Sequence, residues 1–134
     1  MKYWLPLGLY CSLIFFQATL PIPMKEIHYV DKLIHFIVYA VLGVLIFRAI
    51  RSLPGDAGLF VIILIALTIS SIVGFCDEII QIFTPTRTLD RVDFCFDVFG
   101  SLSGMAAYIL IKSRKKKMDK LFADSTKDTR GDTP

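Results

Sequence analysis

The chain consists of long apolar segments separated by short polar ones. Apolar residues dominate residues 3–20, 31–50, 57–83 and 89–111. About 20 such residues, at about 1.5 Å of rise each, cross a hydrocarbon core of about 30 Å. The pattern therefore predicts four transmembrane helices.

The segments between them carry helix-breaking residues. Two prolines stand within residues 21–23, Pro and Gly occur together within residues 54–58, and a Pro stands among threonines within residues 84–88. These are turn signals, and each segment is too short to form a soluble domain. Helices joined by such short loops must pack together, so the predicted fold is all-α, an integral membrane bundle of four transmembrane helices within residues 1–112. Residues 113–134 are basic and polar with few aromatic residues, which predicts a disordered cytoplasmic tail.

The first apolar segment follows Lys2 and also has features of a secretory signal peptide. Pro21 and Pro23 stand where a cleavage site would need small residues, and Tyr10 before Cys11 is incompatible with a lipoprotein cleavage site. An uncleaved first helix is therefore favoured.

Composition supports a membrane protein. Hydrophobic residues make up 54% of the chain, and the mean hydropathy of +0.61 is too high for an ordinary soluble domain. The net charge of +3 comes largely from the basic run at residues 113–117, next to the last apolar segment. Such a run usually faces a cytoplasmic leaflet, so the lipid bilayer is the expected partner and nucleic acid is not.

The Lys and Arg residues also predict an orientation. Lys2, the pair Arg48 and Arg51, and the run at residues 114–117 fall on one side of the membrane if there are four spans. Both termini then face the cytoplasm. The loop before the second helix and the loop after the third lie together on the outer face.

Polar residues recur with helical spacing at the outer ends of three predicted helices. Asp31, His35 and Tyr39 follow one another at intervals of four, which places them on one face of the second helix. Intervals of three or four group Gly74, Glu78 and Gln81 on one face of the third helix, and Asp90, Asp93, Asp97, Gly100 and Gly104 on one face of the fourth. The simplest packing turns these faces toward one another around a shallow outward pocket.

The acidic residues of the fourth helix need partners. Residues 98–111 span only about 21 Å as a helix, too little to cross the bilayer, so Asp93 and Asp97 must lie at or just below the outer interface. A carboxylate at mid-bilayer costs about 2.5 to 3.5 kcal/mol, which favours a pocket over lipid exposure. The nearby candidate cations are Lys32, His35, Arg87 and Arg91.

These residue types suggest two kinds of chemistry. Arg87 and Lys32 could clamp a phosphate or a carboxylate, and His35 with Glu78 or Asp93 could exchange a proton. The remaining candidate ligand-binding residues are Asp31, Tyr39, Gln81, Asp90 and Asp97. A divalent cation on the carboxylates is chemically feasible, but no ligand spacing is diagnostic of a metal, and there is no cofactor motif or Ser or Cys nucleophile motif.

These residues resemble the VanZ-like family of membrane proteins, whose pattern has two blocks. The first reads Asp31-Lys32-x-x-His35-Phe36-x-x-Tyr39. The second reads Gly74-x-x-x-Glu78-x-x-Gln81-x-Phe83-x-Pro85-x-Arg87-x-x-Asp90-x-x-Asp93-x-x-x-Asp97-x-x-Gly100-x-x-x-Gly104. The resemblance covers about the middle three-fifths of the chain, and the first helix and the tail contribute little to it. The chain has Asp97 where the family usually has Asn, and Thr86 where it usually has Gly.

The resemblance implies an integral protein of the bacterial cytoplasmic (inner) membrane, linked to the cell envelope and to susceptibility to the glycopeptide teicoplanin. It implies no particular reaction. Two interpretations of the charged residues follow. In one, an outward polar site binds or modifies a charged envelope lipid or cell-wall precursor. In the other, the chain is a non-enzymatic structural or regulatory subunit, and the same residues form an ion-pair network that holds the helices together.

Overall fold

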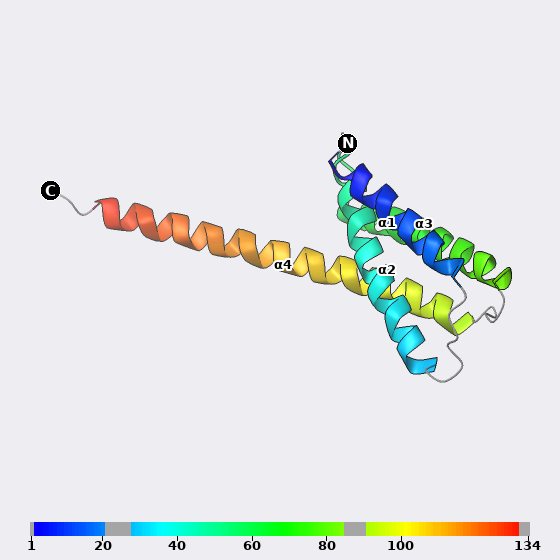
Figure 1. Ribbon diagram of the computed structural model, residues 1–134. Coiled ribbons are helices and arrows are strands. Elements are labelled where there is room, and N and C mark those ends of the chain that lie inside the picture. Colours follow the sequence, from blue (N-terminus) through cyan, green and yellow to red (C-terminus); the bar gives the residue numbers. More distant parts are fainter. Residues whose placement is uncertain (1, 21–27, 85–90, 132–134) are drawn as a thin grey trace.

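The computed structural model describes residues 2–20, 28–84 and 91–131, which form four α-helices (Figure 1). They are α1 (Trp4–Ala18), α2 (His28–Ile50), α3 (Leu59–Ile82) and α4 (Arg91–Gly131). The prediction of an all-α fold with four helices is confirmed.

Three of these helices are long and apolar enough to cross a membrane. Candidate spans occupy Val30–Ile50 of α2, Leu59–Ile82 of α3 and Arg91–Asp124 of α4. The apolar α1 has 15 residues, and its length of about 22 Å is shorter than a hydrocarbon core of about 30 Å. The chain is therefore a membrane protein whose first helix is shorter than the other three.

The loop between α2 and α3 forms where the sequence predicts a turn. Gly55 has a φ of +137°, a conformation that L side chains rarely adopt, and Pro54 precedes it. Gly58 is the residue before the first turn of α3, and its carbonyl accepts a hydrogen bond from the Ile62 amide at 3.1 Å. These residues end one span and begin the next.

The most extensive helix contact in the bundle is between α2 and α4. It depends on glycines that have no room for a side chain. A Cβ on Gly43 would lie 2.6 Å from the carbonyl oxygen of Ser101, and a Cβ on Gly100 or Gly104 would overlap a backbone carbonyl of α2. The backbones of α2 and α4 thus meet directly, and the small residues Gly100 and Gly104, four positions apart on α4, permit this close approach.

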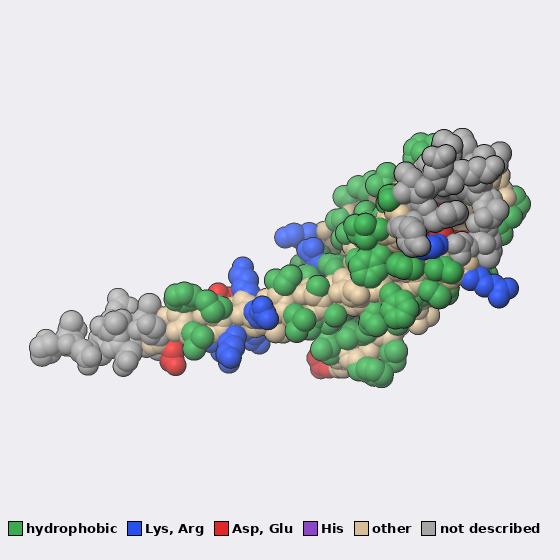
Figure 2. Space-filling model, turned by 90° about the horizontal axis from the view of Figure 1, so that it is seen from below, with side chains coloured by type: hydrophobic (Ala, Val, Ile, Leu, Met, Phe, Trp, Pro, Cys, Tyr) green, Lys and Arg blue, Asp and Glu red, His purple; other side chains and the backbone are tan. Residues whose placement is uncertain are grey.

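Each helix buries one face in a common core. On α3 the buried residues recur mostly at every fourth position, from Ile62 to Glu78. The opposite faces carry exposed apolar side chains, which are suited to contact with lipid (Figure 2). The core cluster contains Ile14, Tyr39, Leu42, Ile46, Phe47, Ile62, Ala66 and Met105.

The up-and-down order of the helices gives the bundle two distinct ends. The polar end holds Asp31, Lys32, His35, Glu78, Gln81, Asp93 and Asp97, where α2 and α4 begin and α3 ends. The basic end holds Tyr3, Arg48, Arg51 and Lys112, where α1 begins and α2 ends.

Beyond the bundle, α4 continues as a helix to Gly131, whereas the sequence suggests a disordered tail from residue 113. The extension runs away from the other three helices (Figure 1). Residues 106–130 contain no Pro or Gly and are rich in Lys, with several Ala and Arg, which have high helix propensity. Local propensity therefore favours a helix here even though the residues from Ser113 to Asp124 are exposed and pack against no core.

Candidate functional site

Three residues of α2 point into the bundle from consecutive turns. His35 and Tyr39 are buried, and Asp31 is half-buried. The rings of His35 and Tyr39 are parallel, with an interplanar angle of 1° and centroids 6.3 Å apart. The predicted polar stripe on this helix is therefore present and faces inward.

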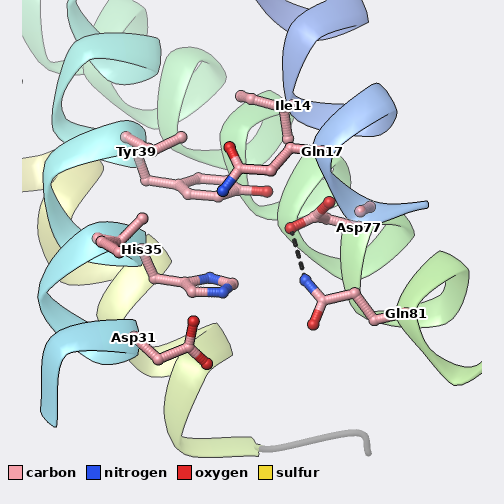
Figure 3. Close-up of a pocket in the computed structure, with 10 residues that line it drawn as sticks. Ile14, Gln17, Asp31, His35, Tyr39, Asp77 and Gln81 are labelled. Carbon is pink, nitrogen blue, oxygen red and sulfur yellow. Dashed lines mark hydrogen bonds between the residues drawn. The ribbon is translucent and has the colours of Figure 1, made fainter. Parts of the chain in front are cut away.

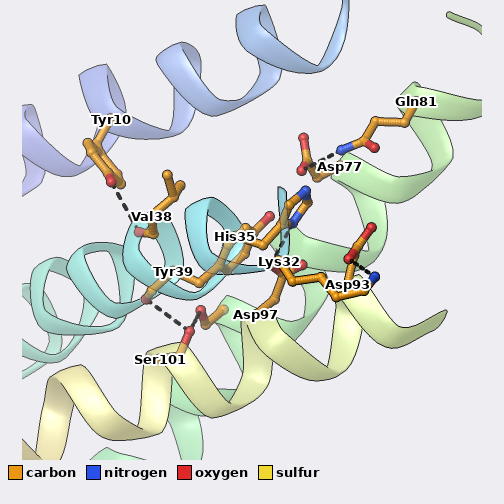
Figure 4. Close-up of polar contacts among 11 residues, drawn as sticks. Tyr10, Lys32, His35, Val38, Tyr39, Asp77, Gln81, Asp93, Asp97 and Ser101 are labelled. Carbon is orange, nitrogen blue, oxygen red and sulfur yellow. Dashed lines mark hydrogen bonds and ion pairs between the residues drawn. The ribbon is translucent and has the colours of Figure 1, made fainter. Parts of the chain in front are cut away.

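His35 is joined to an acidic residue of α4. Its Nδ1 lies 2.9 Å from Oδ1 of Asp97, whose side chain is 0% exposed (Figure 4). A carboxylate bonded to one imidazole nitrogen fixes the orientation of the ring, and this is the arrangement that prepares a histidine for proton transfer. We call this pair the His35–Asp97 dyad.

A second pair joins the same two helices nearer to their ends. Lys32 Nζ lies 2.8 Å from Oδ1 of Asp93, and the two side chains are 19% and 8% exposed. The two acids of α4 that needed partners thus find them on α2. Arg91, another candidate cation, is exposed, and Arg87 lies outside the described residues.

The end of α3 contributes buried polar residues. Gln81 Nε2 donates to Oδ2 of Asp77 at 3.1 Å, and Glu78 is 3% exposed. Asp77 is a site residue that the sequence does not single out. The signal that could have found it is its spacing of four from Gln81, which places both on one helix face.

Polarity extends inward along the contact between α3 and α4. The Ser101 hydroxyl donates to the Tyr39 carbonyl at 3.1 Å and lies 2.5 Å from the Ser70 hydroxyl. Asp97 packs closely against α3 at Gly74, which has no side chain. A Cβ at this position would lie only 2.9 Å from Oδ2 of Asp97. The dyad is therefore held between α2, α3 and α4.

A cavity of about 20 Å³ lies beside His35 and Tyr39 (Figure 3). It has room for about one water molecule. Ile14, Gln17 and Ala18 of α1 line one side of it. The sequence predicts a shallow outward pocket formed by three helices, and the structure instead has a water-sized cavity flanked by the first helix as well.

Two buried oxygens near this cavity make no hydrogen bond to any described residue. They are the Tyr39 hydroxyl and Oδ2 of Asp97. In Figure 3 the Tyr39 hydroxyl points away from α2 toward Asp77. Since buried polar groups are normally satisfied by protein or by ordered water, a water in the cavity is the natural partner of the hydroxyl.

The donor atoms at this end are close enough to share a small ligand. One ligand atom each from His35, Glu78 and Asp97 lie within 4.8 Å of one another, and the same is true of Asp31, His35 and Asp93. An imidazole with two carboxylates can hold a divalent cation, although the dyad and the Lys32–Asp93 pair already engage several of these atoms.

Most of the site residues expected from the sequence are brought together. Arg87 and Asp90 lie outside the described residues. The others gather at the polar end and are buried or half-buried: Asp31, Lys32, His35, Tyr39, Glu78, Gln81, Asp93 and Asp97. The structure adds Gln17 and Asp77, which line the cavity.

Comparison with known proteins identifies the family. A family model described as VanZ/LLP1 matches residues 3–112. The match begins at the first helix, so α1 belongs to the family pattern, in contrast to the resemblance seen in the sequence. No curated protein and no solved structure matches the chain. Because the family model covers most of the chain, this membrane protein belongs to the VanZ/LLP1 family.

Proposed function

We propose that the polar end binds a charged lipid or cell-wall precursor of the bacterial envelope and that the His35–Asp97 dyad acts on it as an acid/base pair. The observation that carries this proposal is the dyad itself, buried in a membrane bundle beside a water-sized cavity.

The energetic cost of the polar end supports a working site. Carboxylates within a membrane span are costly, and apolar side chains of similar volume commonly hold helices together at least as well as buried ion pairs do. Asp97 is fully buried, and one of its oxygens makes no hydrogen bond to a described residue. Such an arrangement is costly for a residue whose role is only to join two helices.

The residues can be given distinct roles. Asp97 orients the imidazole through Nδ1, which leaves Nε2 as the nitrogen that exchanges a proton. The cavity is too small for a lipid headgroup, so the headgroup would bind at the outer ends of the helices, near Asp31 and Lys32. Lys32, with Arg87, would attract the anion, while Glu78 and Asp93 orient the cations.

The proposal includes a location and a phenotype. The basic end and both termini would lie on the cytoplasmic side of the cytoplasmic membrane, because Lys and Arg concentrate at that end. The polar end would then face the envelope. Binding of a lipid-linked precursor at that surface would alter susceptibility to teicoplanin, which acts on the cell wall.

A second candidate function is structural or regulatory. It is favoured by the fact that both described ion pairs, Lys32–Asp93 and His35–Asp97, join α2 to α4. In this case the charges would hold the bundle together and bind nothing.

The two candidates are separated by a susceptibility measurement in a teicoplanin-susceptible bacterium. We expect the wild-type chain to raise the inhibitory teicoplanin concentration and His35→Gln, at the same membrane abundance, to lose this effect. The control Lys116→Gln, in the basic extension beyond the family match, should behave as wild type. If His35→Gln is folded and raises the inhibitory teicoplanin concentration as much as the wild type does, the dyad has no role in this function.

A further inference from the structure

The basic end carries a second cavity, of about 200 Å³, far from the dyad. Residues from three parts of the chain line it: the turn before α1, the end of α2 with the loop after it, and the middle of α4. The lining residues are Tyr3, Arg48, Arg51, Ser52, Tyr108 and Lys112. No carboxylate is among them.

The three cations of this cavity form no ion pair with a described carboxylate. The ion pairs in the described parts of the chain lie at the polar end, and none involves Arg48, Arg51 or Lys112. Like charges gathered at one cavity repel one another, so an anion placed among them is attracted by all three. The cavity therefore offers concentrated positive charge, and its described lining includes no carboxylate.

Two of the cations contact aromatic rings that line the cavity, and the third, Arg51, contacts the Phe47 ring. The Arg48 guanidinium lies 5.4 Å from the ring centroid of Tyr3 and 6.0 Å from that of Tyr108. Lys112 Nζ lies 5.9 Å from the same Tyr108 ring. Contacts with ring faces restrain these side chains while their N–H groups remain available to an acceptor.

The position of the cavity favours a lipid over a free anion. It lies where the apolar part of α2 ends and where Lys112 follows the apolar part of α4. Exposed apolar residues adjoin lining residues in the sequence: Trp4 and Leu5 follow Tyr3, and Ile111 precedes Lys112. Tyrosines and cations at such a level are typical of a membrane–water interface, where acyl chains can run along the apolar surface.

We propose that this cavity binds the phosphate of an anionic phospholipid headgroup in the leaflet that the basic end faces. Arg48, Arg51 and Lys112 contact the phosphate, and the Ser52 hydroxyl adds a donor. The site shares no residue with the polar end, so it stands or fails independently of the proposed function.

The test uses the purified full chain in a mild detergent, titrated with phosphatidylglycerol or with phosphatidylcholine. Lipid adducts are counted by native mass spectrometry, and the melting temperature is measured in parallel, because a ligand of the folded state raises it. We expect phosphatidylglycerol to bind at least about tenfold more tightly than phosphatidylcholine. The triple variant Arg48→Gln, Arg51→Gln, Lys112→Gln should lose this preference.

A matched control removes the same charge elsewhere. The triple variant Lys115→Gln, Lys116→Gln, Lys117→Gln lies outside the cavity lining and should keep the preference. An equal loss in both triple variants would mean diffuse attraction and would overturn the proposal. Equal binding of the two lipids would also overturn it.

Full displacement of phosphatidylglycerol by millimolar inorganic phosphate would identify a free-anion site instead. If the cavity variant fails to fold, Lys112→Gln alone is expected to weaken phosphatidylglycerol binding, and no change would overturn the proposal.

Discussion

The two ends of the bundle differ in how their charged side chains are stabilised. At the polar end, the acidic Asp93 and Asp97 are buried, and each is bonded to a cation or an imidazole of α2. At the basic end, Arg48 and Arg51 are exposed and contact ring faces. A buried charge must have its partner inside the protein, whereas an interfacial charge can take its partner from outside. Loss of a charged side chain should therefore lower the stability of the bundle at the polar end and change it little at the basic end.

The largest effect is expected at Asp97. Asp97→Ala would leave His35 buried without its hydrogen-bond partner, and we expect a loss of about 3 kcal/mol in the free energy of unfolding, in the range for breaking a buried pair. Chemical unfolding in detergent measures it. Asp97→Asn is the matched control, because its amide oxygen can still accept from His35 Nδ1. A small loss for Ala, equal to that for Asn, would show that the dyad contributes little to stability.

A smaller effect is expected at Gly74, which lies against the dyad. In Gly74→Ala the new Cβ would lie 2.9 Å from Oδ2 of Asp97 and 3.3 Å from the Tyr39 ring, so these side chains must move. Overpacking of this kind costs about 1 to 3 kcal/mol. Gly8→Ala on α1 is the control, since nothing lies within 4 Å of its Cβ position. Equal melting temperatures for the two variants would contradict the packing around Asp97.

Lys32 should give a still smaller effect because its pair lies nearer to the end of the bundle. We expect Lys32→Gln to cost about 1 kcal/mol, since its side chain is 19% exposed and water screens the lost interaction. A double-mutant cycle with Asp93→Asn measures the coupling between the two residues. A coupling as large as that between His35 and Asp97 would remove the difference between the inner and outer pairs.

The sequence predicts the helices and their inward faces well, for a physical reason. An apolar span in lipid must satisfy its own backbone hydrogen bonds, which favours a helix. Within a helix, intervals of four place Asp31, His35 and Tyr39 on one face, and this does not depend on how the neighbouring helices pack. The small-residue spacing of α4 also indicates close contact, which the structure provides at Gly100 and Gly104.

What the sequence does not predict depends on contacts between helices. Spacing places Asp97 on the inward face, but only packing decides that it bonds to His35 and not to another cation. The role of α1 is hidden for the same reason, since Gln17 lies in an uncharged segment and becomes a cavity residue only when α1 packs against α2. The end of α4 is a different case, because local helix propensity and low hydrophobicity favour opposite outcomes there.

The smallest effect on stability is expected at the basic end. We expect Arg48→Gln to change the free energy of unfolding by no more than about 0.5 kcal/mol in detergent without lipid, because the side chain is exposed and, among the described residues, contacts aromatic rings and forms no ion pair. The same variant should lose part of the stabilisation that phosphatidylglycerol gives to the wild type, because this increase in the free energy of unfolding comes from the bound lipid and not from the fold. Unfolding measured with and without the lipid separates the two contributions. A large loss without lipid would mean that Arg48 is structural, and the two ends would then no longer differ in how they use charge.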